Sequence, residues 1–142
     1  MPTDHERLRP AWLLALLAGA VTLAAAQGGA VGAADCPAML AALQEPCKPA
    51  IDTVSAAFLS TFPEPPTDDQ VAAATDSLRS SGLPAADCCS QVAAFVAPRC
   101  PCTADYASAL QAKGLPAALG VGSTRAVAAA CGQAAAAFTG CP

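Results

Sequence analysis

The 142-residue sequence has no asparagine, and its single histidine is His5 near the N-terminus. The lack of asparagine and the lack of histidine beyond residue 5 exclude whole classes of function. A chain without asparagine has no acceptor site for N-glycosylation. His5 lies in the polar N-terminal stretch, so the rest of the chain has no imidazole to activate a serine or cysteine nucleophile. The adjacent carboxylates Asp68 and Asp69 are explained by a helix N-terminus, where negative charge is favourable. We therefore expect neither an enzyme nor a cofactor.

Positive charge and bulky side chains are also scarce. The 7 lysines and arginines are outnumbered by 11 aspartates and glutamates, which gives a formal net charge of −4 at pH 7. Since a nucleic-acid-binding protein needs a basic surface, we expect no nucleic-acid partner. Aromatic residues make up 4% of the chain and alanine is abundant, so its helices would bury little volume. Such helices either collapse tightly or leave an apolar space that cross-links hold open.

Cysteine is plentiful, but its arrangement does not suit a metal site. No C-x-x-C pair occurs, and without a nearby histidine the usual zinc ligand sets are missing, so no metal is expected. The even number of cysteines, 8, instead predicts a framework of disulfides. Its members are Cys36, Cys47, Cys88, Cys89, Cys100, Cys102, Cys131 and Cys141.

The N-terminus has the features of a secretory signal peptide, which we predict to span residues 1–26. A polar stretch with two arginines precedes the uncharged run 11–26, which is shorter than the ~20 residues that cross a bilayer. Small residues before Gln27 fit a cleavage site, and a second candidate places cleavage after residue 34. The length of the run disfavours the alternative, an N-terminal membrane anchor. We therefore expect a secreted protein with one disulfide-bonded domain at 35–142.

The abundance of alanine and the near absence of β-branched runs predict an all-α fold. Apolar residues recur at helical spacing, and prolines, glycines and capping residues mark the ends of the elements. The predicted helices lie at 36–47, 49–62, 67–81, 87–97, 103–114 and from 123 or 124 to 131. The predicted loops are 63–66 and 114–122, and one further turn is expected near the C-terminus.

The segment 87–102, DCCSQVAAFVAPRCPC, concentrates the cysteines in the middle of the chain. Neighbouring residues on a helix point about 100° apart, so Cys88 and Cys89 address different sides of their helix. A disulfide between them would be strained, and Cys100 and Cys102 diverge in the same way. Each therefore bonds to a different part of the chain, which makes this helix the hub of a disulfide-stapled bundle. The geometry leaves the choice among the possible pairings open.

The cysteine order C…C…CC…CxC…C…C, from Cys36 to Cys141, resembles the eight-cysteine motif of plant non-specific lipid transfer proteins and their relatives. The wider group includes helical protease and amylase inhibitors and seed-storage proteins. The segments LQEPC, ending at Cys47, and ACG, ending at Gly132, look like further family positions. The resemblance implies four core helices and four disulfides around an apolar cavity that holds an acyl chain. The predicted helix at 67–81 would then be an insertion.

The resemblance also implies how the cysteines pair. Two of the bonds depend on the residue inside the C-x-C, and a polar residue there exchanges the partners of Cys36 and Cys141 relative to an apolar one. Pro101 is apolar, as in the family's smaller type, and favours the arrangement of that type. The favoured bonds are Cys47–Cys88, Cys89–Cys131, Cys36–Cys100 and Cys102–Cys141.

For function, the resemblance implies a monomeric carrier of a fatty acid or phospholipid that makes transient contact with membrane surfaces. The alternatives are a protease or amylase inhibitor, which would use an exposed loop at 63–66 or 114–122, and a structural or storage protein. Arg99, just before Cys100, is either a lipid head-group contact or a solvated charge. The inward stripes of the predicted helices supply the candidate cavity residues, which are Leu40, Leu43, Ile51, Val54, Phe58, Val92, Phe95, Val96, Leu110, Val127 and Phe138.

Overall fold

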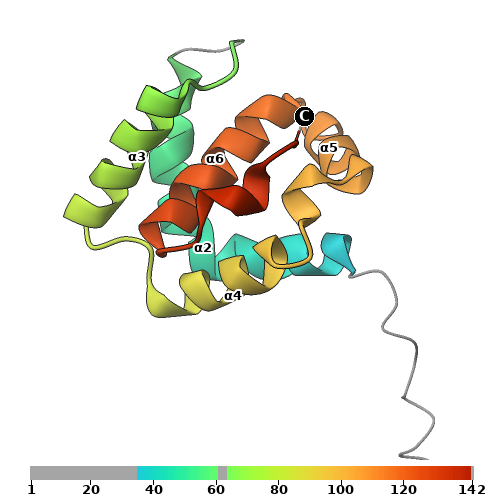
Figure 1. Ribbon diagram of the computed structural model, residues 1–142, viewed down its shortest axis with the longest axis horizontal. Coiled ribbons are helices and arrows are strands. Elements are labelled where there is room, and N and C mark those ends of the chain that lie inside the picture. Colours follow the sequence, from blue (N-terminus) through green and yellow to red (C-terminus); the bar gives the residue numbers. More distant parts are fainter. Residues whose placement is uncertain (1–34, 61–63, 142) are drawn as a thin grey trace, which may run out of the picture. The chain divides into compact units, whose positions relative to one another are not determined.

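The structure, a computed structural model, describes residues 35–60 and 64–141, so the predicted signal peptide at 1–26 and the second cleavage position at 34 lie outside the described residues. Within the described residues the fold is all-helical, without a strand, as the sequence predicts (Figure 1). The α-helices are α2 (Cys36–Leu59), α3 (Asp68–Ser80), α4 (Ala86–Val96), α5 (Ala104–Gln111) and α6 (Ala117–Ala130). Short 3-10 turns, η1 (Cys100–Cys102) and η2 (Ala135–Phe138), follow α4 and α6.

α2 is a single helix where the sequence predicts two. Pro46 and Pro49 lie inside it, and the expected break before Pro49 is absent. A proline within a helix removes one backbone hydrogen bond and bends the helix, but tertiary contacts can carry the helix through it. Cys47 and Ala50 are buried at this point and anchor the bend in the core. Figure 1 shows the two parts of α2 running in different directions, so one helix contributes to two regions of the bundle.

α3 begins and ends where its capping residues predict. The Thr67 side chain accepts a hydrogen bond from the Gln70 N–H (3.3 Å), and the Gln70 side chain accepts one from the Thr67 N–H (2.8 Å). The helix stops before Gly82, whose φ of 69° suits glycine. α3 packs against α6 and α2, and Arg79 donates to the Ala129 carbonyl near the end of α6 (2.7 Å). This helix is therefore an integral part of the bundle.

The predicted loop at 114–122 is largely helical, because α6 begins at Ala117. Gly120 and Gly122, in the helical part of this stretch, conceal the helix in the sequence, since glycine is a poor helix former. The structure explains the need for glycine at position 120: a Cβ there would overlap Leu110 Cδ1 and lie 3.0 Å from the Tyr106 hydroxyl. The missing side chain lets α5 lie close against α6.

Four disulfides cross-link the described residues, and α4 with the adjoining η1 supplies one cysteine to each. The bonds are Cys36–Cys100, Cys47–Cys88, Cys89–Cys131 and Cys102–Cys141. They are the bonds that the family resemblance favours, and Pro101 inside the C-x-C is fully buried. α4 matches the predicted helix at 87–97 and is tied to α2, to the end of α6 and, through η1, to the C-terminal segment. Each such bond contributes roughly 2–4 kcal/mol to stability.

Candidate functional site

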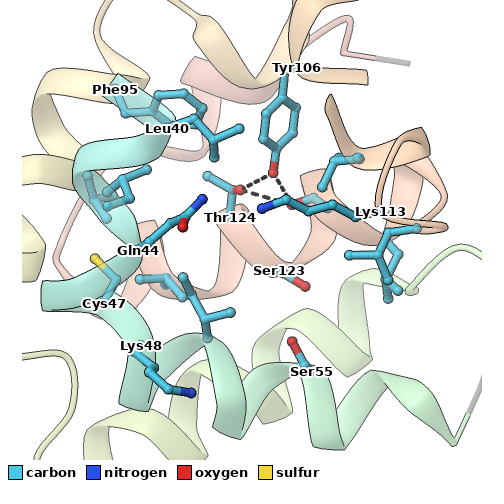
Figure 2. A pocket seen from close by; sticks show the side chains of 18 of the residues that line it. Leu40, Gln44, Cys47, Lys48, Ser55, Phe95, Tyr106, Lys113, Ser123 and Thr124 are labelled. Carbon is cyan, nitrogen blue, oxygen red and sulfur yellow. Dashed lines mark hydrogen bonds between the residues drawn. The ribbon is translucent and has the colours of Figure 1, made fainter. Parts of the chain in front are cut away.

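An apolar pocket of about 380 Å³ opens between α2, α4, α5, α6 and the loop at 112–116 (Figure 2). Aliphatic and phenylalanine side chains form most of its wall: Leu40, Leu43, Ile51, Leu59, Val92, Phe95, Leu110, Leu115, Leu119 and Val127. Polar side chains interrupt this wall at a few points: Gln44, Glu45, Lys48, Ser55, Tyr106, Lys113, Ser123 and Thr124. A concave apolar surface with a few polar groups is typical of a small-molecule site.

The pocket stays open because one of its walls carries small residues. α6 contributes Gly120, Ser123 and Thr124, where bulkier side chains would fill the space. On another side the Cys47–Cys88 disulfide fixes α2 to α4, and Cys47 itself lines the pocket. A protein core normally packs without voids, so a cross-link that fixes the distance between two helices helps to preserve the space. The sequence leaves open whether the alanine-rich helices pack tightly or leave an apolar space between them, and the structure contains such a space.

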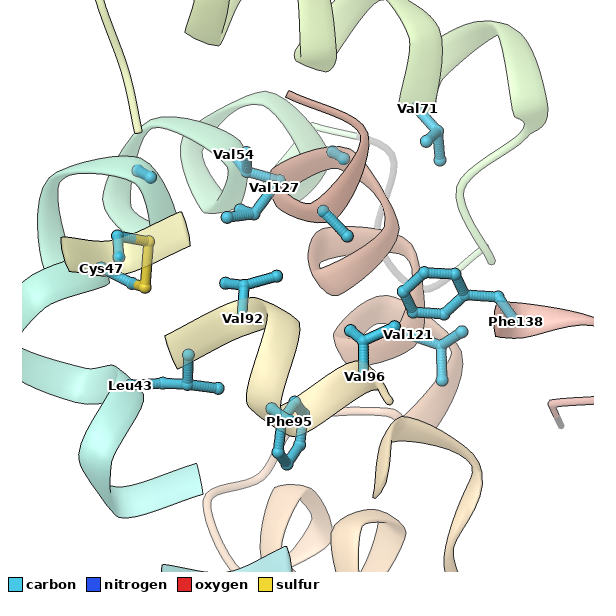
Figure 3. Close-up of a cluster of buried hydrophobic side chains, with 14 of the residues drawn as sticks. Leu43, Cys47, Val54, Val71, Val92, Phe95, Val96, Val121, Val127 and Phe138 are labelled. Carbon is cyan, nitrogen blue, oxygen red and sulfur yellow. A yellow bond between two sulfur atoms is a disulfide. The ribbon is translucent and has the colours of Figure 1, made fainter. Parts of the chain in front are cut away.

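Most of the candidate cavity residues line this pocket, namely Leu40, Leu43, Ile51, Val92, Phe95, Leu110 and Val127. The remaining candidates, Val54, Phe58, Val96 and Phe138, lie in the packed core and not in the pocket wall. Figure 3 shows Val54, Val96 and Phe138 among buried side chains. A helical stripe identifies the inward face of a helix, but part of that face packs against other helices. The stripe alone therefore does not separate wall from core.

Several pocket residues are not among the candidates. Leu119 lies in the stretch predicted to be a loop, so the sequence assigns it no helical face. Leu59 and Leu115 lie at or beyond the ends of helices, where the helical period gives no direction. Tyr106 lies four residues before the candidate Leu110, on the same face of the predicted helix at 103–114, so its spacing would have identified it as a pocket residue.

A triangle of hydrogen bonds lies in the pocket wall. The Tyr106 hydroxyl lies 3.0 Å from the Gly120 carbonyl oxygen and 2.9 Å from Thr124 Oγ1, and Thr124 donates to the same carbonyl (2.9 Å). The Tyr106 ring packs edge-on against Phe95, with the ring centroids 5.5 Å apart. Burial raises the pKa of Tyr106, and the hydrogen bond with Thr124 opposes this increase. The phenol therefore stays protonated at neutral pH.

Exposed apolar side chains edge the opening of the pocket. Ile51, Leu59 and Leu115 expose 37%, 61% and 36% of their surface, and no other large hydrophobic residue in the described chain is as exposed. Apolar surface gathered around one opening indicates a binding site, whereas single exposed residues are ordinary. Lys48 also lies at this opening, and its ion pair with Asp52 (2.7 Å) raises the pKa of Lys48.

Arg99 does not reach the pocket. Its guanidinium donates a hydrogen bond to the Thr139 carbonyl and so connects the start of η1 to the C-terminal segment. The backbone of Arg99 has a φ of 62°, a left-handed conformation that turns the chain from α4 into η1. Arg99 is exposed, as the solvated-charge alternative expects, and it also holds the C-terminal segment against η1.

Other parts of the described chain offer little further chemistry. Residues 35–60 and 64–141 contain no cluster of three or more His, Cys, Asp or Glu side chains that could hold a metal ion, and their cysteines are all in disulfides. None of the helices described is both long and apolar enough to cross a membrane. A smaller hollow of about 190 Å³ lies between α2 and α3 and is walled largely by alanines.

No protein-family model, curated protein or solved structure matches this chain. The likeness in cysteine order to the lipid transfer proteins therefore stays an expectation from the sequence. The function is inferred from the pocket itself.

Proposed function

We propose that the protein is a secreted, monomeric carrier that holds one hydrocarbon chain, of a fatty acid or a phospholipid, in the apolar pocket. The observation that carries this proposal is the pocket, about 380 Å³ in volume and walled mainly by leucine, valine and phenylalanine. A cavity of about 150 Å³ accommodates benzene, so this volume corresponds to on the order of 15 carbon atoms. That is enough for one acyl chain and too little for two.

The expected affinity follows from the apolar surface that such a chain would bury. Each buried methylene contributes about 0.8 kcal/mol, so 15 carbon atoms contribute roughly 12 kcal/mol. Association costs at least about 4 kcal/mol in lost freedom of the ligand. The difference, about 8 kcal/mol, corresponds to a dissociation constant near 1 μM.

The opening of the pocket and the cross-links support the other parts of the proposal. Ile51, Leu59 and Leu115 present apolar side chains around the opening, where a lipid surface would deliver or receive the chain. Four disulfides favour an oxidising compartment, as does the signal peptide predicted at 1–26.

The test is the titration of delipidated, disulfide-bonded mature protein with a fluorescent fatty acid, followed by displacement with an unlabelled one. We expect saturable binding of one ligand per protein with a dissociation constant in the micromolar range. Circular dichroism of the same sample would establish that it is helical and folded. A folded sample without saturable binding at micromolar lipid would refute the proposal.

The inhibitor alternative has less support. Of its two expected loops, 114–122 is helical from Ala117 onward. Leu115, in the part that remains a loop, lines the opening of the pocket, and residue 63 of the other expected loop lies outside the described residues.

A further inference from the structure

Two polar side chains reach over the pocket from opposite walls. Lys113, in the loop between α5 and α6, and Gln44, on α2, point their polar ends towards one another in Figure 2. Both ends also point towards the side of the pocket that carries Tyr106 and Thr124. The pocket is otherwise apolar along most of its wall, so these groups define the place where a polar part of a ligand would lie.

The hydroxyl groups at this place have no proton to offer to a ligand. Thr124 donates its single hydroxyl proton to the Gly120 carbonyl, and Tyr106 donates its own to Thr124 Oγ1 or to the same carbonyl. A ligand group there would face the oxygen atoms of Tyr106, Thr124 and Gly120, which can accept a hydrogen bond but have no proton left to donate. The donors that point towards this place are the Lys113 ammonium and the Gln44 amide, and neither side chain is hydrogen-bonded to a residue that the structure describes.

The two lysines at the opening differ in their charge balance. Lys48 is paired with Asp52 at 2.7 Å and also lies near the Glu45 carboxylate, so an approaching anion would meet no net positive charge there. Lys113 has no ion pair within residues 35–60 and 64–141. Its charge is thus uncompensated, in a chain whose formal net charge is −4. An uncompensated ammonium next to an apolar pocket suits a ligand that joins an acid group to a hydrocarbon chain.

We propose that Lys113 is the residue that makes the pocket selective for hydrocarbon chains ending in an acid group, a carboxylate or a phosphate, over neutral chains. The acid group lies at the opening between Lys113 and Gln44, and the chain extends towards the buried side chains of Val92 and Phe95. This inference rests on the proposed function, since it names the ligand class for the same pocket.

The test compares Lys113→Met with Arg125→Met in the disulfide-bonded mature protein, because Arg125 is not in the pocket wall. Methionine keeps an unbranched stem and removes the charge. Lys113 is exposed, and the ion pair of Arg125 with Asp68 contributes at most about 1 kcal/mol, so both variants should fold. The probes are laurate, dodecyl phosphate and the neutral dodecanol, each measured by displacement of a fluorescent fatty acid. We expect Lys113→Met to weaken binding of the two acids roughly fivefold, the upper range for a partly exposed ion pair, and to leave dodecanol unchanged. Arg125→Met, which removes the same charge away from the pocket wall, should change none of the three affinities.

The outcomes separate this inference from the function on which it rests. If Lys113→Met binds acids and alcohol as the wild type does, or weakens all three equally, Lys113 does not select acids and the inference fails while lipid binding stands. If the wild type binds none of the probes, the proposed function fails and the inference fails with it. A larger loss for laurate than for dodecyl phosphate would indicate a free fatty acid, and the reverse would indicate a phospholipid head group.

Discussion

At position 120 the lack of a side chain lets α5 approach α6, because a Cβ there would overlap Leu110 Cδ1. We expect Gly120→Ala to push the Leu110 side chain into the pocket and to weaken fatty-acid binding roughly four- to fifteenfold, the equivalent of one or two lost methylene contacts. Alanine forms helix better than glycine by about 1 kcal/mol, which offsets the strain. The free energy of unfolding should therefore change little.

Gly122→Ala is the matched control, because Gly122 is not in the pocket wall. A Cβ at this position would lie 2.8 Å from Cγ of the Pro66 ring, which is less able to move aside than a leucine methyl group. This variant should lose about 1–3 kcal/mol of stability through overpacking and keep its lipid affinity. Urea unfolding and ligand titration of both variants measure the two effects. Unchanged affinity in Gly120→Ala would show that Leu110 moves away from the pocket.

Tyr106 is the single tyrosine of the chain, so its ionisation can be followed by ultraviolet difference absorbance. Burial raises its pKa above the ordinary value, so the unfolded chain releases the phenol proton at a lower pH than the folded one. The contribution of Tyr106 to the free energy of unfolding is fully present below about pH 10, and it is lost as the pH rises above this value. Tyr106→Phe should remove this decline, at a cost near neutral pH of about 0.5–1.5 kcal/mol for the lost hydrogen bond. Titration at the ordinary pKa, with equal alkaline destabilisation in both proteins, would contradict the expectation.

At the scale of the elements, the sequence predicts best where a polar side chain caps a helix. Thr67 and Thr103 are the polar residues at the starts of the helices predicted at 67–81 and 103–114, and the structure confirms both starts. The sequence predicts a helix break wrongly where tertiary contacts stabilise a residue of low helix propensity inside a helix. Pro49 lies within α2 beside buried residues, and Gly120 lies within α6 because α5 occupies the space of its side chain. Local propensity does not contain this information.

The inward faces of the helices divide into pocket wall and packed core, and two valines test the division. Val127 is 3% exposed and lines the pocket, whereas Val54 is 0% exposed and does not. We expect Val127→Phe to place its ring in the pocket, weaken fatty-acid binding more than about tenfold and change stability by less than about 1 kcal/mol. Val54→Phe should instead cost about 1–3 kcal/mol and leave binding near its original strength. Chemical unfolding with parallel ligand titration would decide, and equal destabilisation by both substitutions would mean that the pocket is filled.

At the scale of the whole molecule, the order of the cysteines was the most informative part of the sequence. Through the family resemblance it favours the disulfides that the structure contains. Among these are the Cys36–Cys100 and Cys102–Cys141 bonds, which the resemblance associates with an apolar residue at position 101. The volume of the pocket was beyond such a prediction, because it depends on the spacing between α6 and α2 and on the small residues that α6 turns towards the pocket. Lys113 was not among the candidates because these were the apolar residues of the inward stripes, and a lysine near the end of the predicted helix at 103–114 is not one of them.

Two disulfides that close loops of similar length allow their roles to be separated. Cys47–Cys88 spans 41 residues and borders the pocket, and Cys102–Cys141 spans 39 residues and fastens the C-terminal segment. Replacing either pair by alanine should lower the free energy of unfolding by about 2–5 kcal/mol. We expect the first replacement to abolish lipid binding, because α2 can then close towards α4, and the second to leave most of it. Calorimetric melting and fluorescent-lipid titration are the measurements, and retained binding without the first bond would contradict this role for it.

The overlapping loops that the disulfides close also determine how the protein would respond to a protease. The connections between α2 and α3 and between α3 and α4 both lie inside the loops closed by Cys36–Cys100 and Cys47–Cys88. The connection between α5 and α6, which contains the exposed Lys113, lies inside those closed by Cys89–Cys131 and Cys102–Cys141. A single cut in any of these connections therefore leaves two fragments joined by two covalent bonds. Digestion by trypsin at Lys113 would go unnoticed by gel electrophoresis until a reductant was added, and the pocket could survive a broken backbone.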